Sequence, residues 1–261
     1  MRFYAALLAA LVMLTATGVA QAEVKTEVIE YDAAGKTMKG FLAYDASLTG
    51  KRPGVVVFHE WWGLNDYAKH RAEMLAKLGY VAFCADLYGD GKVAEHPEDA
   101  GKMAGAVRMN QETWLARGRA AVKTLADRPE VDPTKIAAIG YCFGGTTALQ
   151  LALAGEDLKA VGAFHAGIPA GVTAEKAKEV KAKVLLAQGG ADAFIPAKVN
   201  AEFTKVLTDN GVSVQLEEYP GATHGYTVEG VEQKMPALKY DASADKKSWA
   251  ALQELLSTTL K

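Results

Sequence analysis

The sequence predicts an α/β domain in which a mostly parallel sheet lies between two layers of helices. Short, continuously apolar runs such as Val55–Phe58 are typical of strands that are buried on both faces. Runs with helical periodicity, such as Tyr67–Leu78, alternate with these strands along the chain. Right-handed crossovers between parallel strands place such helices on both faces of the sheet. The length of 261 residues suits one domain of this class.

The first two expected strands alternate between polar and apolar residues, unlike those that follow. They are Val24–Tyr31 and Thr37–Tyr44, joined through a turn at 32–35 that ends in glycine. Alternation is typical of strands with one solvated face, so we expect an antiparallel pair at one edge of the sheet.

Beyond this pair, buried strands alternate with helices to the end of the chain. The expected strands are Val55–Phe58, Tyr80–Cys84, Ile136–Ile139, Ala160–Phe164, Val184–Ala187 and Val214–Tyr219. The expected helices are Tyr67–Leu78, Glu98–Ala126, Thr146–Ala154, Ala197–Asp209 and Ser243–Leu260. Gly79 ends the first helix, and Pro129 and Pro133 follow the second. Asn110 marks a candidate break within that second helix.

The N-terminus has the features of a secretory signal peptide. Arg2 supplies a positive charge, Ala5–Leu14 is a short apolar core, and Ala20-Gln21-Ala22 fits a small-x-small cleavage site. We expect cleavage after Ala22, which leaves residues 23–261 as one exported domain, with a bacterial periplasm as the favoured destination. The alternative is an uncleaved membrane anchor, but the apolar run is short for a bilayer span. No later segment could cross a bilayer, so we expect no stable membrane insertion after cleavage.

Composition and charge exclude some classes of partner. The net charge is −2, and no basic cluster is present, so there is no electrostatic case for nucleic acid or an anionic membrane. We expect no metal, because no pair of histidine, cysteine or carboxylate side chains shows ligand spacing on one element.

The strongest functional signal is the run Gly140-Tyr141-Cys142-Phe143-Gly144-Gly145. It follows an expected strand and precedes an expected helix. Glycines two residues before and after the cysteine permit a sharp strand-to-helix turn, which displays the central side chain over the carboxyl end of the sheet. We therefore expect Cys142 to be a thiol nucleophile.

A thiol attacks well only as the thiolate, so it needs a base, and the base needs an orienting acid. Asp192 follows the strand that ends at Ala187, and His224 follows the strand that ends at Tyr219. The order nucleophile, acid, histidine is that of the α/β-hydrolases. Two alternatives stay open: Asp192 as the N-cap of the next helix, and His224 as an ordered loop residue.

Two further residues have competing interpretations. Cys84 fits a small buried core residue, although an oxidising compartment could join it to Cys142 in a disulfide. His165 ends a strand near the expected site, where it could line the pocket or have a structural role.

Together these motifs resemble the dienelactone hydrolases, a family of the α/β-hydrolase superfamily with a cysteine nucleophile. The resemblance extends from about Val24 to Leu260. It rests on the runs His59-Glu60-Trp61-Trp62-Gly63, Ala85-Asp86-Leu87-Tyr88-Gly89, Gly140 to Gly145, Gly190-Ala191-Asp192 and Gly221-Ala222-Thr223-His224-Gly225. It implies the α/β-hydrolase fold and a triad of Cys142, His224 and Asp192. It also implies an oxyanion hole formed by the backbone N–H groups of Trp61 and Phe143.

The resemblance also implies that Glu60 contacts the thiol and takes part in its ionisation when substrate arrives. A carboxylate near a thiol disfavours the thiolate until its position or protonation changes, which is compatible with such gating. The alternative is that Glu60 only braces its loop through a backbone hydrogen bond.

One departure concerns the substrate. Family members that act on carboxylated lactones hold the carboxylate with arginines, but Asp90 stands where one is expected and none follows His224. An acid at Asp90 would repel an anionic substrate. Trp62, Tyr88 and Tyr226 could offer an apolar pocket instead, or belong to the core.

These observations lead to an expected function. The chain is expected to be an exported hydrolase that cleaves small ester or lactone substrates through an acyl-thioester, with no cofactor. The alternatives are a non-catalytic binding protein on the same fold, and a thioesterase or peptidase with the same triad.

Overall fold

Eight strands form one sheet in the order β1-β2-β4-β3-β5-β6-β7-β8 in this computed structural model, which describes residues 22–260. The strands are β1 (Val24–Ala33), β2 (Lys36–Asp45), β3 (Arg52–Phe58), β4 (Val81–Ala85), β5 (Val131–Tyr141), β6 (Ala160–Phe164), β7 (Lys183–Gly189) and β8 (Val214–Tyr219). β1 and β4 pair antiparallel with β2, and the remaining pairs are parallel. The antiparallel edge and the parallel centre are therefore confirmed. The expected signal peptide, apart from Ala22, lies outside the described residues.

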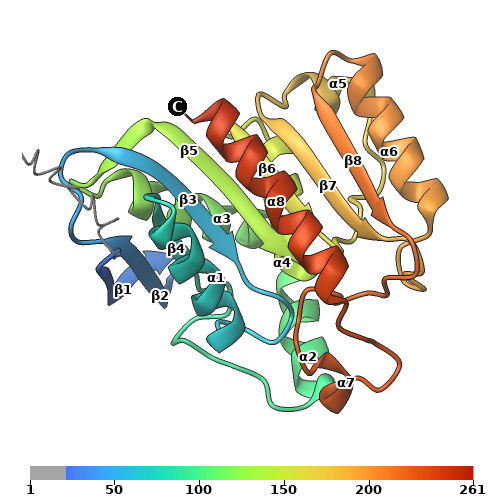
Figure 1. Cartoon of the computed structure of the whole chain (residues 1–261), viewed down its shortest axis with the longest axis horizontal. Helices are drawn as coiled ribbons and strands as arrows, with labels where there is room; N and C mark the ends of the chain where they lie inside the picture. Colours follow the sequence, from blue (N-terminus) through green and yellow to red (C-terminus); the bar gives the residue numbers. More distant parts are fainter. Residues whose placement is uncertain (1–21, 261) are drawn as a thin grey trace, which may run out of the picture.

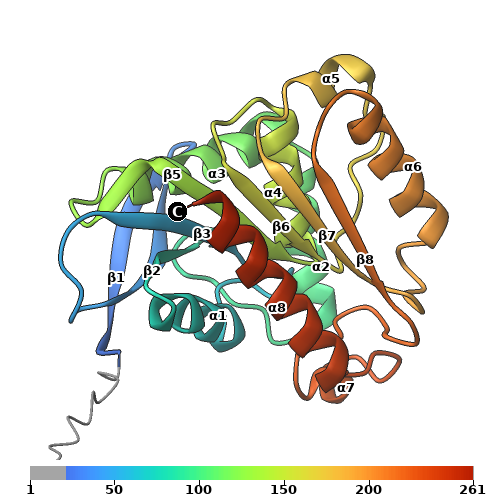
Figure 2. The same ribbon diagram turned by 45° about the horizontal axis from the view of Figure 1, so that its top comes forward.

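Helices cover both faces of the sheet, as the alternating pattern predicts. They are α1 (Asp66–Lys77), α2 (Pro97–Arg108), α3 (Gln111–Ala126), α4 (Phe143–Leu153), α5 (Ala174–Lys178), α6 (Ala197–Asp209), α7 (Val231–Lys234) and α8 (Ala242–Thr259). Apolar side chains of α1 and α8 join the core on one face, and those of α2, α3, α4 and α6 join the core on the other. Figures 1 and 2 show α8 lying across one face, with α3 and α4 behind the sheet.

The two cores explain why the central strands are continuously apolar. In β3, Val56 and Phe58 belong to the core under α3 and α4, whereas Val55 and Val57 belong to the core under α1 and α8. All four side chains are fully buried. Burying one such side chain is worth roughly 1.5–3 kcal/mol. The centre of the sheet is therefore a stable support for the loops that leave it.

The sheet reverses its strand order between β3 and β5, and this point organises the functional loops. The chain passes from β3 to β4 on one side and returns to β5 on the other. Phe58 at the end of β3 pairs with Gly140 near the end of β5, so the segments that follow them leave the sheet side by side. Loops at the carboxyl ends of strands beside such a reversal commonly hold ligands.

Some elements differ from their expected bounds. The long helix expected over 98–126 is two helices, and the Asn110 side chain caps the second by accepting a hydrogen bond from the Thr113 amide. β5 extends through Pro133, because the register with β3 shifts there and the proline lies in a bulge. The short helices α5 and α7 were not expected, since neither is long enough to show a periodic pattern.

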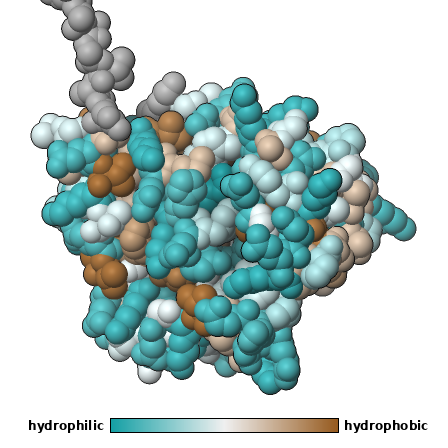
Figure 3. Space-filling view, turned by 60° about the horizontal axis from the view of Figure 1, so that its bottom comes forward, coloured by the Kyte–Doolittle hydropathy of each residue, from teal (hydrophilic) through white to brown (hydrophobic). Residues whose placement is uncertain are grey.

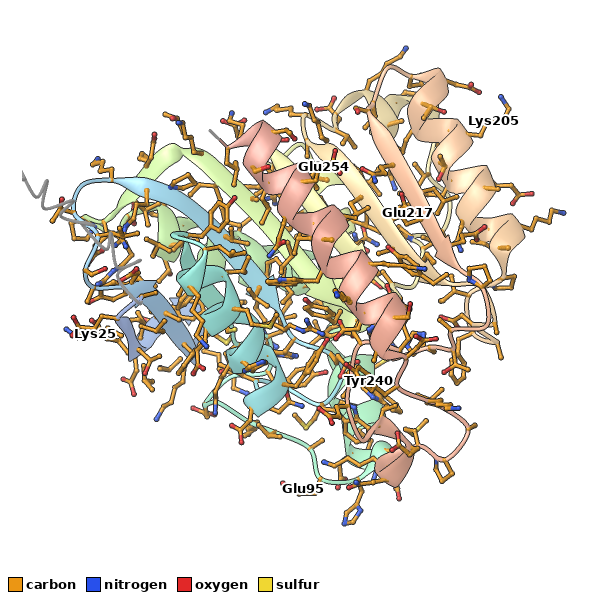
Figure 4. All side chains as sticks on the ribbon, viewed as in Figure 1. Lys25, Glu95, Lys205, Glu217, Tyr240 and Glu254 are labelled. Carbon is orange, nitrogen blue, oxygen red and sulfur yellow. The ribbon has the colours of Figure 1, made fainter. Side chains whose placement is uncertain are left out.

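None of the helices within residues 22–260 combines the length and the apolar character that a bilayer span requires. The longest of them, α8, carries Glu254 on its exposed side (Figure 4).

Candidate active site

Cys142 lies at the turn between β5 and α4, in a backbone conformation that a non-glycine residue rarely adopts. Its φ is 51° and its ψ is −114°. Such strain costs on the order of 1–3 kcal/mol and persists only where the surrounding structure holds it. Here the Cys142 N–H donates to the Phe164 carbonyl at 2.9 Å, which ties the turn to the end of β6. α4 begins at Phe143 and not at Thr146 as expected, so the cysteine directly precedes the helix.

Glycines allow this turn because the backbone packs against itself there. A Cβ atom on Gly140 would lie 2.2 Å from backbone atoms of Gly144, and one on Gly144 would lie 2.1 Å from the Phe58 carbonyl oxygen. No side chain fits at these separations. The sequence motif therefore reflects two close contacts, one within the turn and one between α4 and the end of β3.

His224 and Asp192 come together at the ends of β8 and β7, as expected. The Nδ1–H of His224 donates to Asp192 Oδ2 at 2.8 Å, and the Asp192 side chain is fully buried. The other carboxylate oxygen accepts from the backbone N–H groups of Phe194 and Ile195 at 2.8 and 3.1 Å. Asp192 is therefore not the N-cap of α6, a position that Pro196 occupies. Two backbone donors fix one oxygen and leave the other for the imidazole.

The His224 imidazole is electrostatically coupled to Cys142. Burial alone would lower the His224 pKa, but negative charge on the Cys142 sulfur and the hydrogen bond to Asp192 outweigh burial and raise it. Both groups therefore stabilise the protonated form of His224, which is the form that the imidazole reaches when it accepts a proton. A thiol nucleophile needs a base of this kind nearby.

Glu60 lies on the loop after β3, beside the cavity that also exposes Cys142 and His224. The residue is 6% exposed, and burial raises the pKa of its carboxyl to about 7 against the opposing positive charges of His224 and Arg71. The hydrogen bonds that brace this loop go to the Glu60 backbone carbonyl, from the Gly63 N–H and the His59 ring. The carboxyl group is therefore free to titrate near neutral pH.

Two side chains hold the same loop against the end of β4. Leu87 N–H donates to His59 Nε2 at 3.2 Å, which makes Nδ1 the protonated nitrogen that donates to the Glu60 carbonyl. The Tyr88 hydroxyl donates to the Trp61 carbonyl at 2.8 Å. These contacts fix the peptide that carries the Trp61 N–H. The Phe143 N–H belongs to the first turn of α4, where backbone donors lack partners within the helix.

A cavity of about 320 Å³ opens above Cys142. Its lining includes Trp62, which the sequence predicted for the pocket, together with Glu60, Trp61, Phe143 and His224. Figure 3 turns this end of the molecule forward and shows small apolar patches among hydrophilic side chains. The cavity wall itself is mainly apolar, so it suits a compact ligand with a few polar groups.

Three expectations about the pocket need correction. Tyr226 does not line it: the side chain is fully buried, and its hydroxyl donates to the Ala187 carbonyl at 3.2 Å. Tyr88 is also absent from the wall, because its hydroxyl points to the Trp61 carbonyl on the loop after β3. Asp90 lies outside the cavity, with Lys36 and Lys92 at 4.0 and 3.9 Å, so it does not set the charge of the pocket.

Sequence reasoning missed several residues of the wall. They are Arg108, Thr146, Gly167, Phe194, Ile195, Gly225, Val231, Met235 and Leu238. Arg108 ends α2 and places its guanidinium 5.0 Å from the centre of the Phe143 ring. Arg108 therefore gives the wall a positive charge that none of the sequence motifs indicates. No local pattern marks it, because only the packing of α2 against α3 brings the Arg108 side chain over Phe143 at the start of α4.

The two cysteines are free thiols, so the alternative of a disulfide between them is wrong for this structure. Within residues 22–260 no group of three histidine, cysteine or acidic side chains could hold a metal ion.

The fold and the site define a class, the α/β-hydrolases: a mostly parallel sheet with a nucleophile elbow after β5, an acid after β7 and a histidine after β8. Residues 38–260 match the model of the dienelactone hydrolase family, and the chain belongs to that family. Membership places it among the ester and lactone hydrolases, as the sequence predicted.

Individual relatives agree with this placement. The chain is 31% identical to "Protein usf" of Aquifex pyrophilus over 77% of its own length and 86% of the relative's. It is 29% identical to the carboxymethylenebutenolidase of Pseudomonas putida, over 67% and 75% of the two chains. Among solved structures, a dienelactone hydrolase-like promiscuous phosphotriesterase from metagenomic libraries superposes with a TM-score of 0.87. The two chains are 33% identical, and the match covers 91% of this chain and 99% of that one.

Proposed function

We propose that the protein hydrolyses carboxylic esters or lactones through covalent catalysis by Cys142. The observation that carries the proposal is the placement of this thiol at a strained turn, in a mainly apolar cavity that it shares with His224 of the His224–Asp192 pair. Trp61 on a braced loop and Phe143 at a helix N-terminus, the residues whose N–H groups would be the oxyanion donors, line the same cavity. This set of groups matches what acyl transfer to a thiol needs.

The reaction follows from these roles. His224 accepts the thiol proton, and the Cys142 sulfur attacks the carbonyl carbon, so that the carbonyl π electrons move to oxygen. The N–H groups of Trp61 and Phe143 stabilise that oxyanion. When the carbon–oxygen bond breaks, His224 gives its proton to the departing alkoxide, which leaves an acyl-thioester. Water then attacks with His224 as base, and the acid departs as the thiol is reprotonated.

Glu60 acts in this scheme as a gate on the thiol. Its carboxyl titrates near neutral pH because burial raises its pKa to about 7. In the ionised form it repels the Cys142 thiolate, and in the neutral form it does not. The ionised carboxylate therefore disfavours the thiolate relative to a site with a neutral Glu60, and this gating would protect the nucleophile from oxidation until substrate occupies the cavity.

The cavity wall suggests the kind of substrate. Apolar side chains such as Trp62, Phe194 and Met235 favour an apolar acyl or alcohol group, and Arg108 adds one positive charge. The absence of an arginine at the position of Asp90 motivated the alternative of a non-catalytic binding protein. That motivation falls away, because Asp90 lies outside the cavity and Arg108 lines it.

A substrate panel tests the proposal. Wild type and Cys142→Ala are assayed on p-nitrophenyl esters, lactones, thioesters and a phosphotriester, the last because a structural relative is described as a phosphotriesterase. We expect the esters or lactones to be the best substrates, with a burst of one p-nitrophenolate per enzyme and a matching acyl adduct on Cys142. Unchanged turnover by Cys142→Ala would contradict the proposal.

We also propose that the protein is exported after cleavage following Ala22. The fold suits this cleavage, because β1 begins at Val24 and the Glu23 N–H donates to Asp45 Oδ1 at 3.0 Å. The new amino terminus would carry a positive charge beside the Asp45 carboxylate. N-terminal sequencing of protein from a periplasmic fraction is expected to begin at Glu23. An uncleaved chain in the cytoplasm would contradict export.

A further inference from the structure

His165 lies directly behind the triad histidine and has no part in the reaction described above. It follows β6, is fully buried and has a φ of 36°. Its N–H donates to the Ala187 carbonyl at 2.8 Å, which fixes the strained backbone between β6 and β7. Its ring stands edge-to-face with the His224 ring, with the two centroids 5.1 Å apart and the planes at 68°.

A chain of hydrogen bonds fixes the His165 ring from the other side. Arg71 Nε donates to the Tyr67 hydroxyl at 3.3 Å, Tyr67 lies 2.6 Å from the Thr227 hydroxyl, and Thr227 lies 2.8 Å from His165 Nε2. Arg71 can only donate. If each hydroxyl proton passes to the next acceptor, Tyr67 donates to Thr227 and Thr227 donates to His165 Nε2. The ring is then neutral, with its proton on Nδ1.

The groups around His165 keep it neutral. Burial lowers its pKa well below the ordinary value, and the positive charges of His224 and Arg71 lower it further. Arg71 is itself paired with Asp245 and donates to the Thr227 carbonyl at 2.9 Å, so this cation is fixed in place. His165 therefore stays uncharged while His224 gains and loses its proton.

One more observation separates His165 from an ordinary core residue. Its Nδ1 is buried without a hydrogen-bond partner among the described residues. Leaving a buried polar group unpaired costs about 1–3 kcal/mol. An aromatic hydrocarbon ring would fill the same space without that cost, so a buried imidazole here calls for an explanation beyond packing.

We propose that His165 is a positioning residue for the hydrolysis proposed above: a neutral imidazole, anchored by Thr227, Tyr67 and Arg71, that sets the plane of the His224 ring. The inference rests on the proposed function. Phe194 stands edge-to-face on His224 as well, with centroids 5.2 Å apart, but it is 59% exposed and has no comparable anchor. The buried ring therefore sets the orientation that directs Nδ1 to Asp192 and leaves Nε2 for Cys142.

The test combines a ring replacement with a matched pair of anchor variants. His165→Phe keeps a planar ring but removes Nε2, whereas Thr227→Val removes the anchoring hydroxyl and Thr227→Ser retains it. Thr208→Val, on the exposed side of α6, is the control for the loss of a threonine hydroxyl. Each variant is checked for folding by thermal melting, then assayed on a p-nitrophenyl ester and with iodoacetamide.

A misplaced His224 lowers kcat and slows alkylation of Cys142, with little change in KM. We expect His165→Phe to lose about tenfold to a hundredfold in kcat, the effect of a misplacement of roughly 1 Å. Thr227→Val is expected to show a smaller loss, and Thr227→Ser to restore the rate. The pH at which alkylation is half-maximal is expected to rise in His165→Phe, because a misaligned imidazolium stabilises the thiolate less.

The outcomes separate this inference from the proposed function. If Cys142→Ala is inactive while folded His165→Phe and Thr227→Val hydrolyse ester and alkylate like wild type, the positioning role is wrong and the mechanism stands. Variants that only melt at lower temperature, with wild-type kcat and alkylation, also overturn it. Should His165→Phe not fold, the Thr227→Val and Thr227→Ser pair decides by the same readouts. If Cys142→Ala is active, the proposed function itself fails.

Discussion

Cys84 lies in β4 and Cys142 lies at the turn after β5, and the two thiols meet different surroundings. Cys84 is fully buried, and its Sγ–H donates to the Ala68 carbonyl at 3.0 Å. Burial raises the Cys84 pKa far above its ordinary value. Cys142 is half-buried and lines a cavity together with His224, whose pKa is raised by the Cys142 side chain and by Asp192 against the effect of burial. The same side chain is thus sealed in a strand at one position and open to a cavity at the other, and the proposed function assigns the attack to the open one.

The largest expected effect comes from removing the base that distinguishes the Cys142 site. In His224→Gln or Asp192→Asn the thiol loses its proton acceptor or the orientation of that acceptor. We expect kcat for ester hydrolysis to fall by about 10³–10⁴, as for triads in general. Cys84→Ser, which keeps a donor for the Ala68 carbonyl, is the control and is expected to retain kcat. A large loss of kcat in Cys84→Ser would contradict the assignment of different roles to the two thiols.

Glu60→Gln tests the second difference, a titrating carboxyl that lines the same cavity as Cys142. At pH 8 the wild-type carboxyl is ionised, because its pKa is about 7. Under the proposed gating it then disfavours the thiolate. We expect iodoacetamide to alkylate Glu60→Gln faster at pH 8 by about tenfold, the change that one pKa unit produces. Below pH 6 both proteins carry a neutral group, so their rates are expected to converge. If the ratio of the two alkylation rates does not change with pH, Glu60 does not control the ionisation of the thiol.

The same substitution has a consequence for stability. The Glu60 carboxyl loses its proton near pH 4.5 when unfolded but near pH 7 when folded, so the native state binds more protons between these values. Its stability therefore falls as pH rises through that window. At pH 8 the free energy of unfolding of Glu60→Gln, measured by urea titration, is expected to exceed that of wild type by up to about 3 kcal/mol. At pH 4.5 the two free energies are expected to be equal.

Arg108 gives a smaller effect on the charge of the Cys142 cavity. Iodoacetate is anionic and iodoacetamide is neutral, and the two reagents are of similar size. We expect Arg108→Ala to lower the ratio of iodoacetate to iodoacetamide alkylation by a few-fold, about what a partly screened charge contributes. Arg108→Lys, which keeps the charge, is the control. An unchanged ratio in Arg108→Ala would show that this guanidinium does not act on bound anions.

The smallest effect concerns the backbone at Cys142 and Cys84. Replacing alanine by glycine is expected to raise stability at position 142 and to lower it at position 84. Cys142 has a φ of 51°, which glycine adopts without strain. We expect Cys142→Gly to be more stable than Cys142→Ala by about 1 kcal/mol. At extended Cys84 we expect Cys84→Gly to be less stable than Cys84→Ala by about the same amount. Urea unfolding of the four variants measures the stability difference between glycine and alanine at each position. Differences of the same sign at both positions would mean that the turn is not strained.

The sequence predicts the fold and the polar centre of the site because both depend on local patterns. Strand ends and the glycines around Cys142 are visible in the chain, and they place His224 and Asp192 correctly. The cavity wall is different. Arg108 and Leu238 reach it through packing of distant elements, and Tyr226, although next to the histidine motif, turns inward to Ala187.

The role proposed for His165 shows the same limit. Its position after β6 is clear from the chain, but its anchor is Thr227, which lies 62 residues away in sequence. A single histidine after a strand does not reveal which hydroxyl it meets. Only the pairing of β6 with β7, and the return of the chain after β8, brings these groups together.

Selective labelling tests most directly whether surroundings make Cys142 the nucleophile. The native protein is treated with one equivalent of iodoacetamide near neutral pH and then digested, and the modified peptide is identified by mass spectrometry. We predict that Cys142 carries the label, that Cys84 stays free until the protein is unfolded, and that ester hydrolysis disappears in proportion to labelling. Labelling of Cys84 first, or full activity in protein labelled at Cys142, would contradict the account.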